Sequence, residues 1–461
     1  MVFPRIIHTL GSVVSELSSD GDMTVEEVLP GLSGKLTGAE HDWLDSIGLR
    51  LDSPTMLREW AQWAHSLAFE SLGQAIISSG GGKTPPRRAL RSDDIVWGRA
   101  PARLDTGGGW TDTPPYSLEH GGCVIDIAVN LNGQPPIQAY MRVIDEPVIR
   151  LGSIDLGTRI EVNSLDELLD YRQETSEHAL AKAALALSGF SLETANWPKG
   201  TTLKQMLEQF GGGIELTTLA AIPKGSGLGT SSIMGAVILA VIQRVIGQTL
   251  TQKELFHAVL RLEQSLTTGG GWQDQIGGAV GGAKIVTTEP GLVPDAKIRY
   301  LPADVLDPKV NNGQTLLYYT GITRLAKDIL GQVVGRYLDR DRKTLSTLRQ
   351  IHALAPQVAE ALSRKDIRAF GQLVDAAWQL NKQLDPNSTN DEIEALLLRV
   401  QPYIFGAKLL GAGGGGFLLM VCKSAEDAEQ VRMMLEAEPA NERARFFDYG
   451  INPKGLVVTV C

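Results

Sequence analysis

The spacing of apolar and polar positions changes early in the chain. Between Asp52 and Ser79, apolar side chains recur at every third and fourth position, which predicts an amphipathic helix. Ser53-Pro54 supplies a suitable N-cap and first helical residue. The segment 78–91 contains three consecutive glycines and a Pro-Pro-Arg-Arg sequence, which is typical of a linker. We therefore predict a helical N-terminal region with its linker over residues 1–92.

Beyond this linker the pattern mixes strands and helices. We predict strands over Asp94–Arg99, Gly122–Asn130, Ile137–Arg150 (one or two), Thr315–Thr320, Phe417–Cys422 and Leu456–Val460. Helices are predicted after Ser164-x-x-Glu167 and Thr251-x-x-Glu254, which have capping-box spacing, between Ile322 and Leu380, and near Ala425–Glu438. Helices and strands alternate without a long parallel series, and no repeat of about 20–50 residues is present, so the α+β class is favoured.

The most informative segment is a glycine-rich turn that leads directly into an apolar helix. It reads Pro223-Lys224-Gly225-Ser226-Gly227-Leu228-Gly229-Thr230-Ser231-Ser232, and an apolar run from Ile233 to Ile242 follows. Glycines let a backbone wrap closely around an anion, and the first turn of a helix offers unpaired N–H groups. The pattern fits neither the Walker loop nor the dinucleotide fingerprint. Taken alone, it is also typical of a flexible loop before a core helix.

The composition narrows the class of protein. Of the 461 residues, 43% are hydrophobic and 21% charged, as in ordinary globular proteins. The net charge is −10 and no run of Lys or Arg forms a basic track, so we expect no nucleic-acid partner. The longest apolar run has ten residues, about half of a bilayer span, and no secretory signal begins the chain. Three widely spaced cysteines argue against a disulfide framework or zinc site. We therefore expect a cytoplasmic protein.

Two further glycine-rich segments accompany the turn. Arg99–Tyr116 contains Gly107-Gly108-Gly109-Trp110-Thr111-Asp112, and Leu410–Phe417 contains five glycines. In this order, the three segments resemble the three motifs of the kinases named for galactose, homoserine, mevalonate and phosphomevalonate (GHMP kinases). The resemblance covers roughly Val96–Cys461. It implies a ribosomal-protein-like α+β domain over 93–300 and a ferredoxin-like domain over 301–461, with the active site between them and the third motif beside the turn.

The resemblance also implies ATP and Mg2+ and assigns residues to them. Backbone groups of Lys224, Gly225, Ser226, Gly227, Leu228, Gly229, Thr230, Ser231 and Ser232 would hold the ATP phosphates. Ser231 and Glu263 would hold magnesium, which prefers oxygen ligands. Asp274, eleven positions after Glu263, would accept the proton of the sugar hydroxyl or orient that hydroxyl. Arg103 would stabilise the transferring phosphoryl group. Considered singly, Glu263 is typical of a solvated helix face, Asp274 of a turn and Arg103 of a surface ion pair.

The first motif bears on the substrate. Gly108-Gly109-Trp110-Thr111-Asp112 stands where galactokinase-like members have Gly-Glu-His-Thr-Asp, so Asp112 is expected to accept hydrogen bonds from a hexose. The loss of the Glu-His pair argues against galactose. The continuation through Tyr116 resembles the kinase part of L-fucokinases, which implies Gly108, Gly109, Trp110, Asp112 and Tyr116 as sugar-binding residues. We therefore predict an ATP-dependent kinase that converts L-fucose to L-fucose 1-phosphate.

Three alternatives stay open. A heptose-7-phosphate 1-kinase has a similar Gly-Gly-x-Thr-Asp pattern and would need further basic residues, for which Arg142, Arg150 and Arg324 are candidates. The other two are a galactose-type hexose 1-kinase and a sugar-binding regulatory protein with a decayed kinase site. In the bifunctional fucokinases a nucleotidyltransferase and a β-helix precede the kinase. This sequence carries neither pattern, so we expect it to make the sugar phosphate alone.

Overall fold

The computed structural model describes residues 84–461, except 174–175, 177, 224, 267–269, 292 and 323–325, together with His8, Gly11, Ala64, His65 and Leu67. The helix predicted between Asp52 and Ser79 and most of the predicted region 1–92 therefore lie outside the described residues.

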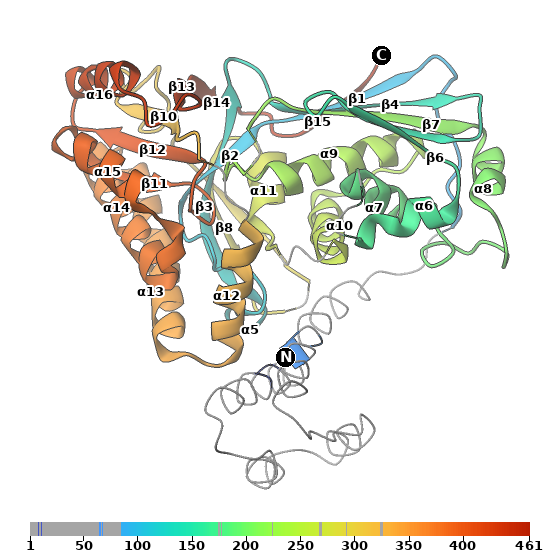
Figure 1. Cartoon of the computed structure of the whole chain (residues 1–461), viewed down its shortest axis with the longest axis horizontal. Helices are drawn as coiled ribbons and strands as arrows, with labels where there is room; N and C mark the ends of the chain where they lie inside the picture. Colours follow the sequence, from blue (N-terminus) through green and yellow to red (C-terminus); the bar gives the residue numbers. More distant parts are fainter. Residues whose placement is uncertain are drawn as a thin grey trace, which may run out of the picture.

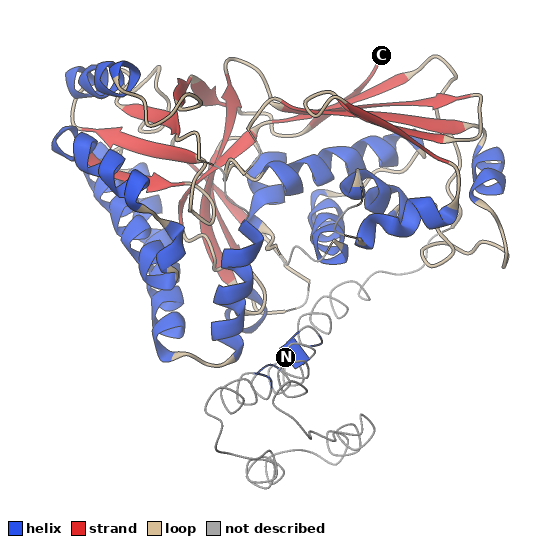
Figure 2. Ribbon diagram, in the orientation of Figure 1, coloured by secondary structure: helices blue, strands red, loops and turns tan. Residues whose placement is uncertain are grey.

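A six-stranded sheet carries the glycine-rich turn. Its order is β15-β1-β4-β7-β5-β6, formed by β1 (Ile95–Ala100), β4 (Ile137–Ile144), β5 (Ile149–Ser153), β6 (Thr158–Val162), β7 (Gly213–Ala220) and β15 (Val457–Val460). α9 (Thr230–Val245) packs on β1 and β4, and its apolar run explains why it is buried on nearly every side. The other helices of this domain are α6 (Leu165–Leu169), α7 (Ala179–Leu187), α8 (Leu203–Phe210) and α10 (Gln252–Ser265), with the short η1 (Asp170–Arg172). Figure 2 shows α9, α10 and α7 gathered beneath one face of the sheet.

A second sheet runs through the middle of the molecule (Figure 1). It has the order β14-β3-β8-β9, with β2 also paired to β3, and consists of β2 (Ala102–Gly107), β3 (Gly122–Leu131), β8 (Ala283–Thr288), β9 (Lys297–Leu301) and β14 (Tyr449–Ile451). The short α5 (Tyr116–His120) precedes β3. Along β3, Val124 packs with residues of α11 (Gln273–Ala279), whereas Ile125 belongs to the large core that includes Val358 of α13 (Arg342–Ser363). Because side chains alternate along a strand, the two helices cover opposite faces.

The third sheet is antiparallel and has the order β11-β12-β10-β13. Its strands are β10 (Thr315–Tyr319), β11 (Ile404–Leu409), β12 (Phe417–Cys422) and β13 (Arg445–Phe447). In chain order these are the second, third, first and fourth strands, which is the ferredoxin-like arrangement that we expected. The remaining elements are α12 (Ala326–Leu338), α14 (Ile367–Leu384), α15 (Asp391–Val400) and α16 (Ala425–Ala437), with η2 (Pro386–Ser388) and η3 (Gln401–Tyr403).

The predicted elements are found at or near their expected positions. Ile137–Arg150 divides into β4 and the start of β5, and α12, α13 and α14 occupy the region predicted as helical between Ile322 and Leu380. Thr251 and Glu254 form the expected capping box at the start of α10. At α6 the Ser164 side chain caps the helix as expected, but the Glu167 carboxylate bonds the Asn163 N–H instead of closing the box.

The last strands of the chain return to sheets that begin within the predicted N-terminal domain. β14 pairs with β3 and β15 pairs with β1, although both lie in the range 301–461 predicted as the C-terminal domain. Without β15, β1 would have an open edge of unpaired N–H and C=O groups. The end of the chain therefore binds the two domains together.

Candidate active site

The glycine-rich turn lies directly against the third glycine-rich segment. Gly225, Gly227 and Gly229 have φ values of +66°, +73° and +74°, in the left-handed region that favours glycine. A Cβ on Gly227 would clash with the carbonyl oxygen of Leu410, so this backbone approach excludes any side chain. The Phe417 N–H donates to the Ser226 carbonyl oxygen across 3.0 Å. The third motif thus lies beside the turn, as we expected.

α9 begins at Thr230 with its first turn uncapped by any described side chain. Its N-cap residue is Gly229, which supplies no capping oxygen. Ser231 is exposed at this end, whereas Ser232 is buried. The Leu228 side chain is fully buried, so this residue offers only its backbone to a ligand. Lys224 lies outside the described residues. The turn and the helix end together have the form of an anion-binding site.

Glu263 of α10 reaches the start of α9. Its Oε1 accepts a hydrogen bond from Ser232 Oγ at 2.9 Å and from Ser231 Oγ at 3.4 Å. Glu263 is 3% exposed. A carboxylate beside an exposed hydroxyl gives the all-oxygen donor set that a hard cation prefers, so Ser231 and Glu263 fit a magnesium ion.

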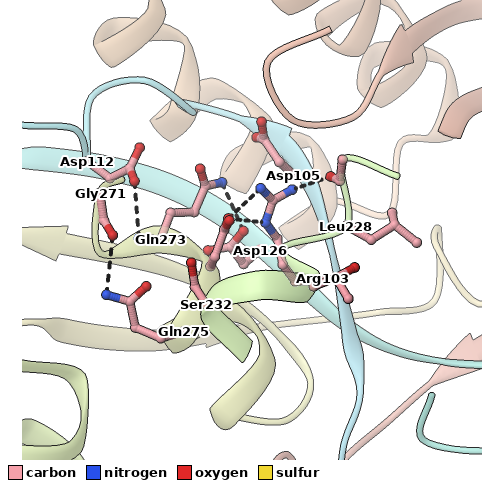
Figure 3. A network of polar contacts seen from close by, with 12 residues as sticks. Arg103, Asp105, Asp112, Asp126, Leu228, Ser232, Gly271, Gln273 and Gln275 are labelled. Atoms are coloured by element: carbon pink, nitrogen blue, oxygen red, sulfur yellow. Dashed lines mark hydrogen bonds and ion pairs between the residues drawn. The ribbon is translucent and has the colours of Figure 1, made fainter. Parts of the chain in front are cut away.

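Arg103 of β2 joins the turn to Asp274 in the first turn of α11. Its Nε donates to Asp274 Oδ1 at 2.8 Å, and its Nη1 donates to the Gly227 carbonyl oxygen at 3.1 Å. Arg103 is buried, and burial alone would lower its pKa. The negative charges of Asp274, Asp105 and Asp126 outweigh this effect and raise the pKa, so the guanidinium stays charged. Figure 3 shows Arg103 with Asp105 and Asp126 nearby.

Asp112 approaches the α11 turn from the loop after β2. Its Oδ2 accepts a hydrogen bond from the Gln273 N–H at 3.1 Å. A Cβ on Gly271 would clash with this same carboxylate, so a glycine is needed for the close approach. Burial, reinforced by the negative charge of Asp274, raises the pKa of Asp112 to about 7. The predicted sugar-binding carboxylate and the predicted catalytic carboxylate therefore meet at one turn.

Family models match both halves of this site. The GHMP kinases N terminal domain matches residues 196–282, and the GHMP kinases C terminal domain matches residues 358–441. The first match includes the glycine-rich turn, Glu263 and Asp274, and the second includes the third motif. The chain therefore matches both domains of the GHMP kinases.

Two longer proteins align with most of this chain. The chain is 40% identical over 95% of its length to an L-fucokinase/L-fucose-1-P guanylyltransferase of Bacteroides fragilis, of which it covers 46%. It is 34% identical over 76% of its length to a bifunctional fucokinase/GDP-fucose pyrophosphorylase of Arabidopsis thaliana, of which it covers 32%. The chain thus spans less than half the length of these two relatives.

Solved structures agree on the fold. A D-glycero-D-manno-heptose 1-phosphate kinase from Bacteroides thetaiotaomicron superposes with a TM-score of 0.57 at 19% identity, over 79% of this chain and 98% of that one. At this identity the similarity concerns the fold alone. No helix in the described part of this chain combines the length and apolar character needed to cross a bilayer.

The other predicted sugar-binding residues are fixed by packing. Trp110 has φ +81° and is 9% exposed in an apolar cluster with Tyr116 and Tyr337. The Tyr116 hydroxyl lies 3.2 Å from His352 Nδ1. A Cβ on Gly108 would clash with the Cys123 carbonyl, and one on Gly109 with the Asp105 carboxylate. Asp112, in contrast, places its carboxylate against the start of α11.

A network of buried charges beneath the site was not predicted. Asp105, Asp126 and Lys284 stand opposite one another on β2, β3 and β8. Lys408 of β11 donates to Asp105 Oδ2 at 2.7 Å, and both side chains are buried. The signal was present in the sequence, since Asp126, Lys284 and Lys408 are single charges within apolar strand segments. Such charges require partners inside the protein.

Proposed function

We propose that this chain is an ATP-dependent sugar 1-kinase that converts L-fucose to L-fucose 1-phosphate. The proposal rests chiefly on one arrangement, in which Arg103 joins Asp274 to the glycine-rich turn at the start of α9. The 40% identity to a protein named L-fucokinase/L-fucose-1-P guanylyltransferase supports L-fucose as the acceptor. Because the chain covers 46% of that protein, the proposal is limited to the kinase reaction.

The turn and the helix end would hold the nucleotide. Backbone N–H groups between Gly225 and Ser232 are suited to the ATP phosphates, since three glycines in left-handed conformation leave the backbone accessible. Ser231 and Glu263 would hold Mg2+, which neutralises negative charge on the phosphates. Buried Ser232 would act indirectly, because its hydroxyl bonds the Glu263 carboxylate.

Asp274 and Arg103 would act on the transferring group. A bond forms between the anomeric oxygen of the sugar and the γ-phosphorus, and the bond from that phosphorus to the β–γ bridging oxygen breaks. Asp274 accepts the hydroxyl proton or orients the hydroxyl for in-line attack. The Arg103 cation, already aligned by Asp274 and the Gly227 carbonyl, stabilises negative charge on the phosphoryl oxygens.

Asp112 would bind the sugar. A buried carboxylate that accepts hydrogen bonds from hydroxyls discriminates strongly, because an analogue without the hydroxyl leaves the buried carboxylate unpaired. Trp110 and Tyr116 would shape the apolar wall behind it, since both are largely buried against α12 and α13.

We also place the enzyme in the cytoplasm, where ATP is available.

A substrate panel tests the proposal. The protein is incubated with ATP, Mg2+ and L-fucose, galactose, arabinose or heptose 7-phosphate, and ADP release is followed. L-fucose is expected to be the best substrate. Turnover with heptose 7-phosphate and with none of the other sugars would contradict the assignment of L-fucose. Sugar binding without turnover would indicate a regulatory protein.

Two of the arginines suggested for binding a second phosphate already form ion pairs, Arg142 with Glu215 and Arg150 with Glu161. Arg324 lies outside the described residues.

A further inference from the structure

α11, which carries Asp274, is packed unusually closely on the central sheet. A Cβ on Gly277 would lie 3.0 Å from Arg103 Cβ and 3.1 Å from Asp126 Cγ. A Cβ on Gly278 would press on the Ile233 side chain of α9. The two glycines therefore allow α11 to lie between the sheet and α9, and the position of Asp274 depends on how α11 is held there.

Asp126 holds the N-terminal end of this helix. It stands on β3, is fully buried, and its Oδ1 accepts a hydrogen bond from Gln273 Nε2 at 3.0 Å (Figure 3). The backbone N–H of the same glutamine donates to Asp112 Oδ2. Gln273 is thus fixed at two points, one on the strand and one on the first motif, immediately before Asp274.

Lys284 holds the other end of the helix. It is the cross-strand neighbour of Asp126 on β8 and is fully buried. Its Nζ donates to the carbonyl oxygens of Gly277 at 2.9 Å and Gly282 at 3.2 Å. Burial raises the pKa of Asp126 and lowers the pKa of Lys284, and the two opposite charges counteract these shifts. A buried pair of this kind is costly unless both groups are hydrogen-bonded, and here each bonds α11.

We propose that Asp126 and Lys284 are positioning residues that hold α11 at its two ends and so fix Asp274 relative to Arg103 and the glycine-rich turn. This inference rests on the proposed kinase function for its effect on rate. Its effect on α11 itself is independent of any reaction. Neither residue is expected to touch substrate, because both are fully buried beneath the helix.

The test uses variants that remove the contacts without leaving a lone buried charge. The double variant Asp126→Leu with Lys284→Met removes both contacts with α11 and is neutral at both positions, and Gln273→Met removes the hydrogen bond to Asp126 while keeping a similar volume. We expect kcat to fall by about tenfold or more in both variants, because small displacements of a catalytic group are costly. KM for ATP should stay within about twofold, since α9 and its turn keep their contacts.

A matched control is available in the same domain. Lys182 is also a buried lysine, paired with Asp170 at 2.8 Å, but it lies on α7. Lys182→Met should lower stability with kcat unchanged. Asp126→Asn alone, whose amide oxygen still accepts from Gln273, should recover part of the rate lost in a variant with Asp126→Leu.

Hydrogen exchange gives a readout independent of turnover. Amides of α11 should exchange faster in the double variant and in Gln273→Met, whereas amides of α9 should not. Unchanged α11 exchange, or a loss of kcat no larger than that of Lys182→Met, would overturn the inference. If the unaltered protein has no sugar-dependent turnover, the proposed function fails, and the exchange measurement still decides whether the pair holds α11.

Discussion

Arg103 Nε and Asp274 Oδ1 lie 2.8 Å apart, although 171 positions separate the two residues in the sequence. The Nη1 of the same guanidinium bonds the Gly227 carbonyl oxygen. One side chain of β2 therefore aligns the carboxylate of α11 with the turn that would hold the ATP phosphates. The predictions below follow from this alignment and from the groups around it.

Replacing Asp274 by asparagine should abolish most of the turnover. The amide cannot take the hydroxyl proton, and it forms a weaker contact with Arg103, so kcat should fall by about 10²–10⁴-fold. The measurement is ADP release at saturating sugar and ATP, with circular dichroism to verify that the variant is folded. A variant with at least half of the original kcat would show that Asp274 does not act on the substrate.

Arg103→Lys should lower kcat by about 10²-fold. A lysine cannot bond both Asp274 and the Gly227 carbonyl with a rigid, planar group, although it keeps the positive charge. Arg142→Lys is the control, because Arg142 forms an exposed pair with Glu215 on β4. Equal activities of the two variants would argue against a role for the guanidinium geometry.

The sugar kcat/KM should rise with pH around neutrality. The ionised Asp112 carboxylate accepts hydroxyl hydrogen bonds more strongly than the protonated acid, and its pKa is raised to about 7. The profile should therefore show an inflection near pH 7 that is lost in Asp112→Asn. An inflection that persists in this variant would have to arise from another group.

The contribution of Asp112 to the free energy of unfolding should fall as the pH rises, whereas kcat/KM rises. The pKa of Asp112 is raised from 3.8 to about 7 by folding, so the folded state binds the proton more tightly than the unfolded state. This contribution is fully present below pH 3.8 and is lost as the pH rises toward 7. Urea unfolding of the original protein and Asp112→Asn should show a smaller loss of stability across this range in the variant.

Glu263→Gln should raise the magnesium concentration needed for half-maximal activity by about tenfold or more, because a neutral amide is a poor ligand for a hard cation. Glu254→Gln on the same helix is the control, since Glu254 belongs to the exposed capping box of α10. A magnesium titration of both variants makes the comparison. Coinciding curves would remove Glu263 from the metal site.

Gly227→Ala should destabilise the protein more than Gly133→Ala. Both glycines have positive φ, +73° and +81°, so each substitution costs about 1 kcal/mol or more in backbone strain. At Gly133 no atom lies near the added methyl, whereas at Gly227 it meets the Leu410 carbonyl. Thermal unfolding should therefore give a clearly lower Tm for Gly227→Ala, and equal values would contradict the close contact between turn and third motif.

The sequence predicted those parts of the site that depend on local pattern. The glycine-rich turn and the apolar run after it specify the start of α9 by conformation and hydrophobicity alone. Thr251 and Glu254 likewise specify the start of α10, because a capping box is a contact between residues three apart. The family resemblance then pointed to Asp274 and Arg103, which the structure brings together.

Features that depend on strand register could not be predicted in this way. Asp126 stands between Asp105 and Lys284 only because β3 pairs with β2 and β8 in one particular register. Lys408 reaches Asp105 from 303 positions away, and no local pattern identifies such a partner. The return of β15 to β1 is similar, since an apolar strand pattern does not specify which edge it will join.

The most direct test is to identify the product of the reaction. The protein, ATP, Mg2+ and L-fucose are incubated, and phosphorus NMR is recorded together with ADP release. We predict one new sugar 1-phosphate resonance formed in equal amount to ADP, with kcat/KM for L-fucose above that for galactose, and no product with Asp274→Asn. ADP release that does not depend on L-fucose, or a product formed equally by Asp274→Asn, would contradict the assignment of this site as an L-fucose 1-kinase.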